Sequence, residues 1–143
     1  MSSGPALAFD DVTCRFAGRD GVEYTAVAGA RPIGSTALLE DLVVPVSALT
    51  GTVEQLSELC GKHRYDDAVI FGHARDGNLH FMVTADLRDP AQVDKFAVFT
   101  EDLVDLVLAA DGSLKAEHGT GRIMAPYVRR QYGDELYECM VEV

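Results

Sequence analysis

The sequence predicts an α+β fold, a ferredoxin-like β-α-β-β-α-β sandwich with an added C-terminal helix. Two observations lead to this prediction. Short β-rich apolar stretches cover residues 36–45 and 69–84, and apolar residues recur at helical spacing between and after them. The order of these stretches matches the split β-α-β motif. With 143 residues, 48% of them hydrophobic, the chain is long enough for one compact domain with a single core.

The N-terminal stretch gives the weakest pattern. Residues 1–30 show no clear periodicity and are interrupted by several glycines, so they are predicted as an uncommitted leader with a short extended piece near residues 22–27. They also lack the basic and apolar regions of a secretory signal peptide. The domain proper is predicted over residues 31–143.

The first strand and helix follow this leader. Residues 36–45 form a β-rich run that ends at a proline, and we predict the first strand there. Apolar residues at helical spacing then predict a helix over residues 47–60. Thr52 and Gln55 suit a capping box, and Gly61 suits the position just past the helix end.

The second half of the chain has one strong helix signal. Asp89, Pro90 and Gln92 supply an N-cap, a first-turn proline and an N3 glutamine before an apolar face of about 20 residues that ends at Gly112. Residues 113–117 are predicted as a short fourth strand. A final helix is predicted from Gly133 or Asp134 to the C-terminus, with one apolar face formed by Leu136, Tyr137 and Met140.

The stretch from residue 69 to 84 contains the first candidate for chemistry. Asp76-Gly77 lies between two apolar runs, which is the strongest short-range signal for a two-residue hairpin turn. With that turn, His73 lies directly opposite His80, where Cβ atoms are about 4.5–5.5 Å apart. Asn78 lies on the same face as His80, because side chains two apart in a strand point the same way.

Two imidazoles at that separation can share a metal ion. Glu117 is the natural carboxylate partner, and a His–His–carboxylate set suits zinc, manganese or iron(II) with positions left for water or substrate. The alternative is that His73 and His80 are packed structural residues. The run Gly119-Thr120-Gly121 can let a backbone approach a ligand closely, or it can serve turn geometry alone.

Composition excludes several functions. The net charge is −11, which leaves no basic stripe for a nucleic acid and disfavours anionic membrane surfaces. No apolar run approaches the roughly 20 residues of a membrane span. The three cysteines are far apart and form no CxxC pair, so reduced thiols in a cytoplasmic protein are expected rather than a disulfide framework.

Two motifs resemble a known family. GHARDGNLHF, followed after a helix by GSLKAEHGTGRIMAPYV, is similar to the C-terminal substrate (cap) domain of FAD-linked oxidases. The resemblance runs from Arg19 or Arg31 to the end of the chain. It implies part of an FAD-dependent dehydrogenase that oxidises a D-2-hydroxy acid of the lactate, glycolate or 2-hydroxyglutarate class to the 2-keto acid.

The resemblance also implies roles for single residues. His73, His80 and Glu117 match the residues that hold a divalent metal, usually zinc, and Asn78 matches a residue that lines the same pocket. His118 matches the general base that takes the proton of the substrate hydroxyl. Gly119, Thr120 and Gly121 are assigned to the flavin side of the site.

The sequence departs from the family pattern in ways that matter for activity. The family's FAD-binding domain is not in this sequence, so the chain is expected to be a fragment that is inactive without a flavin domain and prone to self-association. Some members carry a substrate-binding lysine just before a Glu-Asp pair, where this chain has Leu38-Leu39-Glu40-Asp41, and Arg19 and Arg31 are the suggested substitutes. Two alternatives stay open: a stand-alone ferredoxin-like binding module with structural histidines, and a small His–His–Glu metallohydrolase.

Overall fold

The computed structural model describes residues 14–17, 23–26, 34–119 and 121–143 of the chain. The chain divides into two units, residues 1–35 and 36–143. In the first unit, β1 (Cys14–Ala17) and β2 (Glu23–Ala26) form an antiparallel pair. The extended piece predicted near residues 22–27 is therefore confirmed. The remainder of the predicted leader and Arg31 lie outside the described residues.

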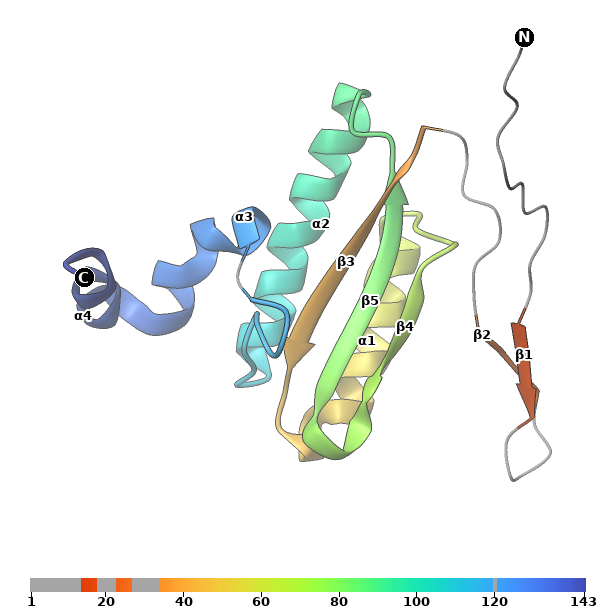
Figure 1. The fold of residues 1–143 in the computed structure, drawn as a ribbon, viewed down its shortest axis with the longest axis horizontal. Coiled ribbons are helices and arrows are strands. Elements are labelled where there is room, and N and C mark those ends of the chain that lie inside the picture. Colours follow the sequence, from red (N-terminus) through yellow and green to blue (C-terminus); the bar gives the residue numbers. More distant parts are fainter. Residues whose placement is uncertain (1–13, 18–22, 27–33, 120) are drawn as a thin grey trace, which may run out of the picture. The chain divides into compact units, whose positions relative to one another are not determined.

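The second unit is an antiparallel sheet covered on one face by two helices (Figure 1). Its strands are β3 (Thr36–Val43), β4 (Val69–His73) and the central β5 (Asn78–Ala85), in the order β3-β5-β4. Helix α1 (Leu49–Lys62) leads from β3 to β4, and α2 (Pro90–Ala109) follows β5. This confirms the α+β class, although a sheet of three strands is only partly ferredoxin-like.

The predicted fourth strand over residues 113–117 is wrong. Among the described residues, the backbone of this segment pairs with the backbone of β3 at an isolated bridge alone: Ser113 N–H donates to Val43 O over 2.7 Å, and Val43 N–H donates to Ser113 O over 3.0 Å. The N–H groups of residues 116–118 donate to the carboxylate of Asp41 instead of to a neighbouring strand. A side chain thus takes the backbone hydrogen bonds that would have extended the sheet.

Helix α2 begins as predicted. The Asp89 side chain accepts a hydrogen bond from the N–H of Ala91 over 3.0 Å, and Pro90 is the first helical residue. The helix ends at Ala109, before the predicted Gly112, and Asp111 adopts the left-handed conformation, with φ 54°.

Both predicted caps of α1 are wrong. The 3-10 turn η1 (Val46–Ala48) leads into the helix, and Thr52 lies inside the helix with its hydroxyl donating to Ala48 O over 3.0 Å. At the other end Gly61 is still helical, and Arg64 takes the left-handed position with φ 55°. Arg64 N–H donates to Gly61 O and Tyr65 N–H donates to Cys60 O, which is a Schellman ending without its usual glycine.

The C-terminal part is more helical than predicted. It contains α3 (Gly121–Met124), the 3-10 turn η3 (Ala125–Tyr127) and α4 (Val128–Val141). Gly133 interrupts α4 with φ 79° and ψ 170°, so the predicted helix from residue 133 is the second half of a broken one. No helix within the described ranges combines the length and apolarity that crossing a membrane requires.

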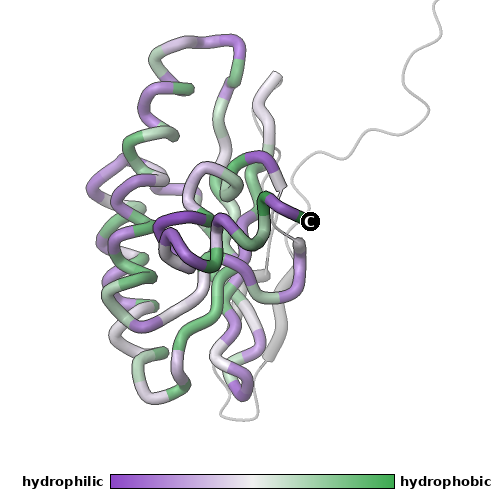
Figure 2. Tube along the Cα trace, turned by 90° about the vertical axis from the view of Figure 1, so that its left-hand side faces the viewer, coloured by the Kyte–Doolittle hydropathy of each residue, from purple (hydrophilic) through white to green (hydrophobic). Residues whose placement is uncertain are grey.

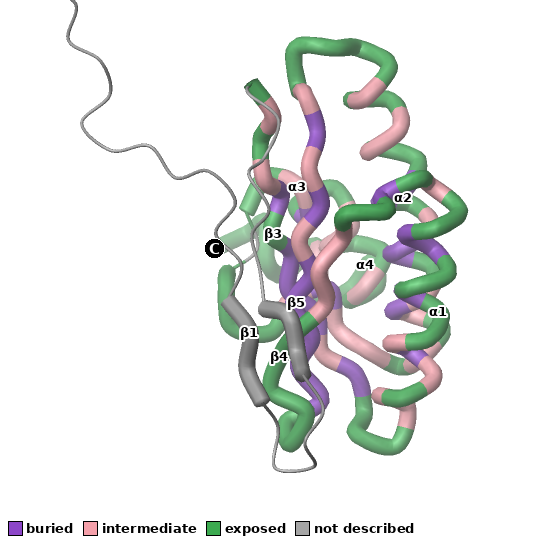
Figure 3. The backbone as a smooth tube through the Cα atoms, turned by 90° about the vertical axis from the view of Figure 1, so that its right-hand side faces the viewer, coloured by how far each residue is buried: buried purple, intermediate pink, exposed green. Residues whose placement is uncertain are grey.

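The core lies between the helices and the facing side of the sheet. Alternate residues of β5, including Phe81 and Val83, point into this layer and are fully buried, as are Leu56 of α1 and Phe99 of α2. Figure 3 shows the buried residues along β5 and on the sheet-facing sides of both helices, and Figure 2 shows the hydrophobic residues of the helices recurring along the chain. The other residues of β5, among them His80, therefore point to the face that α1 and α2 leave uncovered.

Candidate functional site

The hairpin between β4 and β5 has a longer turn than predicted. The 3-10 turn η2 (Ala74–Asp76) and Gly77 connect the strands, so His73 lies opposite Asn78 and His80 lies opposite Phe71. The predicted two-residue turn and the direct pairing of His73 with His80 are therefore wrong.

The two histidines are nevertheless neighbours. The predicted and observed registers differ by two residues, and a shift of two keeps every side chain on its face, whereas a shift of one would have reversed it. His73 and His80 are thus diagonal neighbours on the uncovered face of the sheet. Their ring centroids lie 5.4 Å apart, with the ring planes at 89°.

Gly77 explains the longer turn. Its φ is 71°, a left-handed value that glycine adopts without a steric penalty. A Cβ atom at this position would lie 2.0 Å from the carbonyl oxygen of Val44, and the Gly77 carbonyl accepts a hydrogen bond from Val44 N–H over 3.0 Å. The turn is therefore fixed by its contact with the segment that follows β3.

The imidazole groups of three histidines gather around one carboxylate oxygen. The distance to Glu117 Oε1 is 2.9 Å from His80 Nε2, 3.3 Å from His73 Nε2 and 3.7 Å from His118 Nε2. The His80 side chain is 5% exposed, whereas those of His73 and Glu117 are 60% and 50% exposed. The cluster therefore has a buried wall and an open side.

The donor set fits a divalent metal ion. One ligand atom from each of His73, His80 and Glu117 lies within 4.8 Å of the other two. Zinc ligands about 2.0–2.2 Å from the metal in a tetrahedral arrangement are about 3.3–3.5 Å from each other, close to the observed separations. Two imidazoles and one carboxylate leave further coordination positions for water or substrate, as in catalytic sites.

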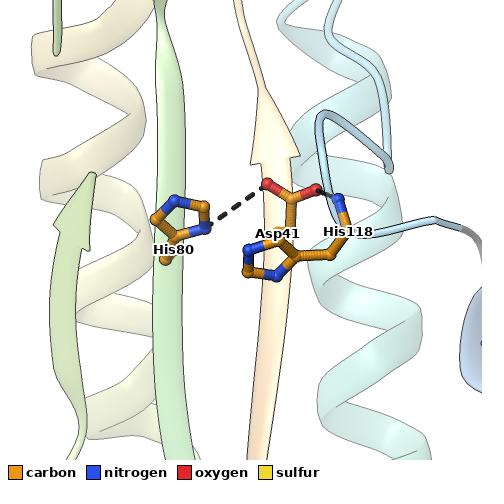
Figure 4. Close-up of side chains that lie close together, drawn as sticks. All are labelled: Asp41, His80 and His118. Atoms are coloured by element: carbon orange, nitrogen blue, oxygen red, sulfur yellow. Dashed lines mark hydrogen bonds and ion pairs between the residues drawn. The ribbon is translucent and has the colours of Figure 1, made fainter. Parts of the chain in front are cut away.

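Asp41 is the central residue that sequence reasoning missed. One of its oxygens, Oδ2, accepts the N–H groups of Ala116, Glu117 and His118 over 2.9, 2.8 and 3.0 Å. The other, Oδ1, accepts a hydrogen bond from Asn78 Nδ2 over 3.0 Å and lies 3.4 Å from His80 Nδ1 (Figure 4). The available signal was a pair of acidic residues, at positions 40 and 41, inside an otherwise apolar strand.

Asp41 remains charged despite its position. The residue is 1% exposed, and burial alone would raise its pKa. The hydrogen bonds from the backbone of residues 116–118 and from Asn78 outweigh burial, so the pKa of Asp41 is lowered from its usual value.

His118 lies against His80. The two rings are stacked, with centroids 4.7 Å apart and planes at 9° (Figure 4). The His118 side chain is 40% exposed, so a ligand on the open side can reach it. Asp41, His80 and His118 form a second group whose potential ligand atoms lie within 4.8 Å of one another.

The other predicted site residues are placed as follows. Asn78 is buried; its amide nitrogen donates to Asp41, and its Oδ1 accepts no hydrogen bond from any residue that the structure describes. Gly119 and Gly121 have φ values of 64° and 59°, and within the described part of the chain no atom beyond their sequence neighbours lies within 4 Å of a would-be Cβ. Their backbone is therefore open to a ligand. Thr120 and Arg31 lie outside the described residues.

A cavity of about 220 Å³ lies beside His118, with Leu39, Glu40, Lys115 and Arg122 among its lining residues. Burial raises the pKa of Glu40, an effect that the positive charge of Lys115 opposes. The cavity thus offers two cationic groups and an apolar side chain next to the histidine cluster.

Comparison with known proteins gives consistent results. A model of the family described as FAD linked oxidases, C-terminal domain, matches residues 17–143. The chain is 31% identical over 117 residues to the glycolate oxidase subunit GlcD of Bacillus subtilis, covering 81% of this chain and 24% of that protein. It is 35% identical over 118 residues to a probable mitochondrial D-lactate dehydrogenase of Danio rerio, covering 82% and 23%. It is 30% identical over 117 residues to a D-2-hydroxyglutarate dehydrogenase of Haemophilus influenzae, covering 82% and 10%. The chain spans less than a quarter of the length of each of these relatives.

Proposed function

We propose that this chain, which belongs to the C-terminal domain family of FAD linked oxidases, binds the substrate in an FAD-dependent dehydrogenase that oxidises a D-2-hydroxy acid to the 2-keto acid. The observation that carries the proposal is the convergence of His73 and His80 on Glu117 at the open side of the sheet. The names of the three relatives all refer to 2-hydroxy acids. The family match does not favour a stand-alone binding module or a metallohydrolase.

In this proposal His73, His80 and Glu117 hold a divalent metal, with zinc the first choice for two imidazoles and a carboxylate. The metal would polarise the substrate hydroxyl, and the FAD of a partner domain would accept the hydride from C2. The buried side of the cluster excludes water behind the metal, and the exposed side admits the hydroxy acid.

His118 is proposed as the general base. It is exposed enough to reach a bound substrate, and its stacking on His80 fixes the plane of its ring beside the metal ligands. An imidazole has an ordinary pKa of about 6.5, which suits a base that works near neutral pH. His118 takes the hydroxyl proton as the C2–H bond breaks, so that one proton and one hydride leave the substrate together.

The remaining assignments concern partners. Gly119, Thr120 and Gly121 are proposed to face the flavin, and Asn78 and Arg31 to contribute to substrate binding. An FAD-binding domain, in the same or another polypeptide, would complete the enzyme, and without it the chain is expected to have no dehydrogenase activity. Self-association and a cytoplasmic location are part of the same proposal.

Metal binding by isothermal titration calorimetry tests the proposal. We expect the wild-type chain to bind one Zn²⁺ or Mn²⁺, and His80→Ala to lose this binding. His63→Ala is the matched control, because His63 belongs to the helical layer, where its Nε2 lies 2.7 Å from Asp102 Oδ2. A wild-type chain that binds neither metal, or a loss of binding in the control as large as in His80→Ala, contradicts the proposed site.

Ligand binding to the metal-loaded chain tests the substrate class. We expect D-lactate, glycolate or D-2-hydroxyglutarate to bind the zinc-loaded chain, and propionate, which lacks the hydroxyl of lactate, to bind at least ten times more weakly. Equal binding of lactate and propionate would show that the substrate hydroxyl does not contribute to recognition.

A further inference from the structure

We infer that Asp41 is the positioning residue of this site: it fixes the proton of His80 on Nδ1 and holds the backbone that carries Glu117 and His118. The inference rests on the proposed metal site and adds to it a residue that touches neither metal nor substrate. Asp41 is buried on β3, and its two oxygens serve two different parts of the cluster.

The proton position follows from the surroundings of the His80 ring. A neutral imidazole carries one N–H, and an ionised carboxylate only accepts hydrogen bonds. Nδ1 is fully buried and makes no hydrogen bond to any described residue, and its ion-pair partner Asp41 Oδ1 lies 3.4 Å away, so without a proton Nδ1 would be a second buried acceptor facing this carboxylate. Two buried acceptors facing each other repel, and neither gains a hydrogen bond, which favours the proton at Nδ1.

The other nitrogen of the ring then becomes the metal ligand. Nε2 lies 2.9 Å from Oε1 of Glu117, whose side chain is half exposed and can be solvated or turned away. With its proton on Nδ1, His80 presents a lone pair at Nε2 next to a carboxylate oxygen. Two acceptors at this distance need a proton or a metal ion between them, and a metal ion satisfies both.

The second oxygen of Asp41 organises the loop. Three consecutive N–H groups, from residues 116–118, converge on Oδ2, and hydrogen bonds to a charged acceptor are about twice as strong as neutral ones. This arrangement holds the backbone at Glu117 and His118 while their side chains extend over His80. Both halves of the site are therefore fixed by one carboxylate.

The substitution Asp41→Asn tests this with almost no change in shape. The new amide group must place its NH₂ either against the three backbone donors or against His80. In the second orientation it donates to Nδ1 and moves the His80 proton to Nε2, where the metal would bind. We expect zinc affinity to fall 10- to 100-fold, the range found when a partner of a metal-bound histidine is removed. Glu40→Gln removes the same charge from the adjacent position and should keep the affinity within threefold.

Nitrogen-15 NMR of the metal-free chain supplies a readout that a purely structural role would not change. At alkaline pH, with the imidazole neutral, we expect His80 to carry its proton on Nδ1 in the wild type and on Nε2 in Asp41→Asn. A wild-type Nε2–H tautomer overturns the inference, even if the variant does not fold. So does an Asp41→Asn variant with wild-type zinc affinity. A wild-type chain with the Nδ1–H tautomer but no metal binding supports this inference and contradicts the proposed function.

Discussion

Gly77 lies where the β4–β5 turn meets the segment that follows β3. Its left-handed φ and the 2.0 Å separation between a would-be Cβ and Val44 O leave room for glycine alone. Since the turn sets the register of β4 against β5, this residue also decides that His73 and His80 are diagonal neighbours.

Replacing Gly77 by alanine should therefore be strongly destabilising. Gly119 is the matched control, because its φ of 64° is similar but no described atom beyond its sequence neighbours lies within 4 Å of its would-be Cβ. We expect Gly119→Ala to cost about 1–2 kcal/mol of unfolding free energy from backbone strain alone. Gly77→Ala should cost about 2 kcal/mol more, because the backbone around Val44 must move. Urea unfolding measures both, and equal losses would show that the contact with Val44 is unimportant.

Residue types were enough to find the metal candidates but not Asp41. Histidine and glutamate indicate a candidate site by their chemistry. The predicted register was wrong by two residues, which leaves each histidine side chain on the predicted face of the sheet. Asp41 accepts hydrogen bonds from the backbone N–H groups of residues 116–118, which come 75 to 77 positions later in the sequence. No local sequence pattern contains such a contact. Asn78 similarly turned out to contact Asp41.

At the scale of elements, the C-terminal segments are attached to α2 by polar contacts. The Tyr127 hydroxyl in η3 donates to Glu101 Oε1 over 2.7 Å, and Arg130 of α4 pairs with Glu101 and Asp105. Burial, the hydrogen bond to Glu101 and its negative charge raise the pKa of Tyr127 to about 12.

This pKa makes a prediction at alkaline pH. A tyrosine whose folded pKa is raised contributes stability that is fully present below its unfolded pKa of about 10 and lost as the pH rises through the folded value. Ultraviolet titration of the wild type should show a tyrosine that ionises at unusually high pH, and this transition should be absent in Tyr127→Phe. Glu101→Gln should bring the pKa of Tyr127 back toward 10. An unchanged late transition in Tyr127→Phe would assign it to another tyrosine.

Packing and surface charge should contribute very differently to the helical layer. Phe99 is fully buried in α2 and contacts the rings of Tyr65 and Phe81 at centroid distances of 5.1 and 5.8 Å. Phe99→Ala should cost about 3–5 kcal/mol of unfolding free energy. Arg130→Ala removes two exposed ion pairs, to Glu101 and Asp105, and should cost less than about 1 kcal/mol. Chemical denaturation compares them, and similar losses would contradict this ranking.

The elements differ in how much their own residues reveal. Helix α2 was predictable because Asp89 and Pro90 form its start locally. The absence of the predicted fourth strand could not be foreseen, because Asp41 competes for the hydrogen bonds of residues 116–118. The end of α1 was misplaced because Arg64 adopts a conformation usually left to glycine.

For the whole molecule, metal binding should be visible as stability. The net charge of −11 favours cation uptake, and a ligand bound only by the folded state stabilises it by about 2.7 kcal/mol at 100 times its Kd. For a domain of this size that corresponds to a rise in Tm of about 10 °C or more. Differential scanning calorimetry with Zn²⁺ and then EDTA checks this. His80→Ala should show no rise, and a rise equal to that of the wild type would place the metal elsewhere.

The fold class was predictable at this scale because apolar periodicity alone distinguishes strands from helices. The number of strands in the sheet depends on which acceptor binds the N–H groups of residues 116–118. Hydrophobic periodicity carries no information about that choice of acceptor. The sheet of the second unit therefore contains the first three predicted strands, β3, β4 and β5, and departs from the prediction at the isolated bridge between Val43 and Ser113.

The contact between Asp41 and three backbone N–H groups has a consequence for the evolution of the site. Because Oδ2 recognises amides that every residue except proline possesses, the side chains at positions 117 and 118 are free to change while the loop keeps its path. Selection could therefore exchange the proposed metal ligand or the proposed base independently of the scaffold. A protein engineer who wished to install a different metal preference could begin with those two positions and leave Asp41 in place.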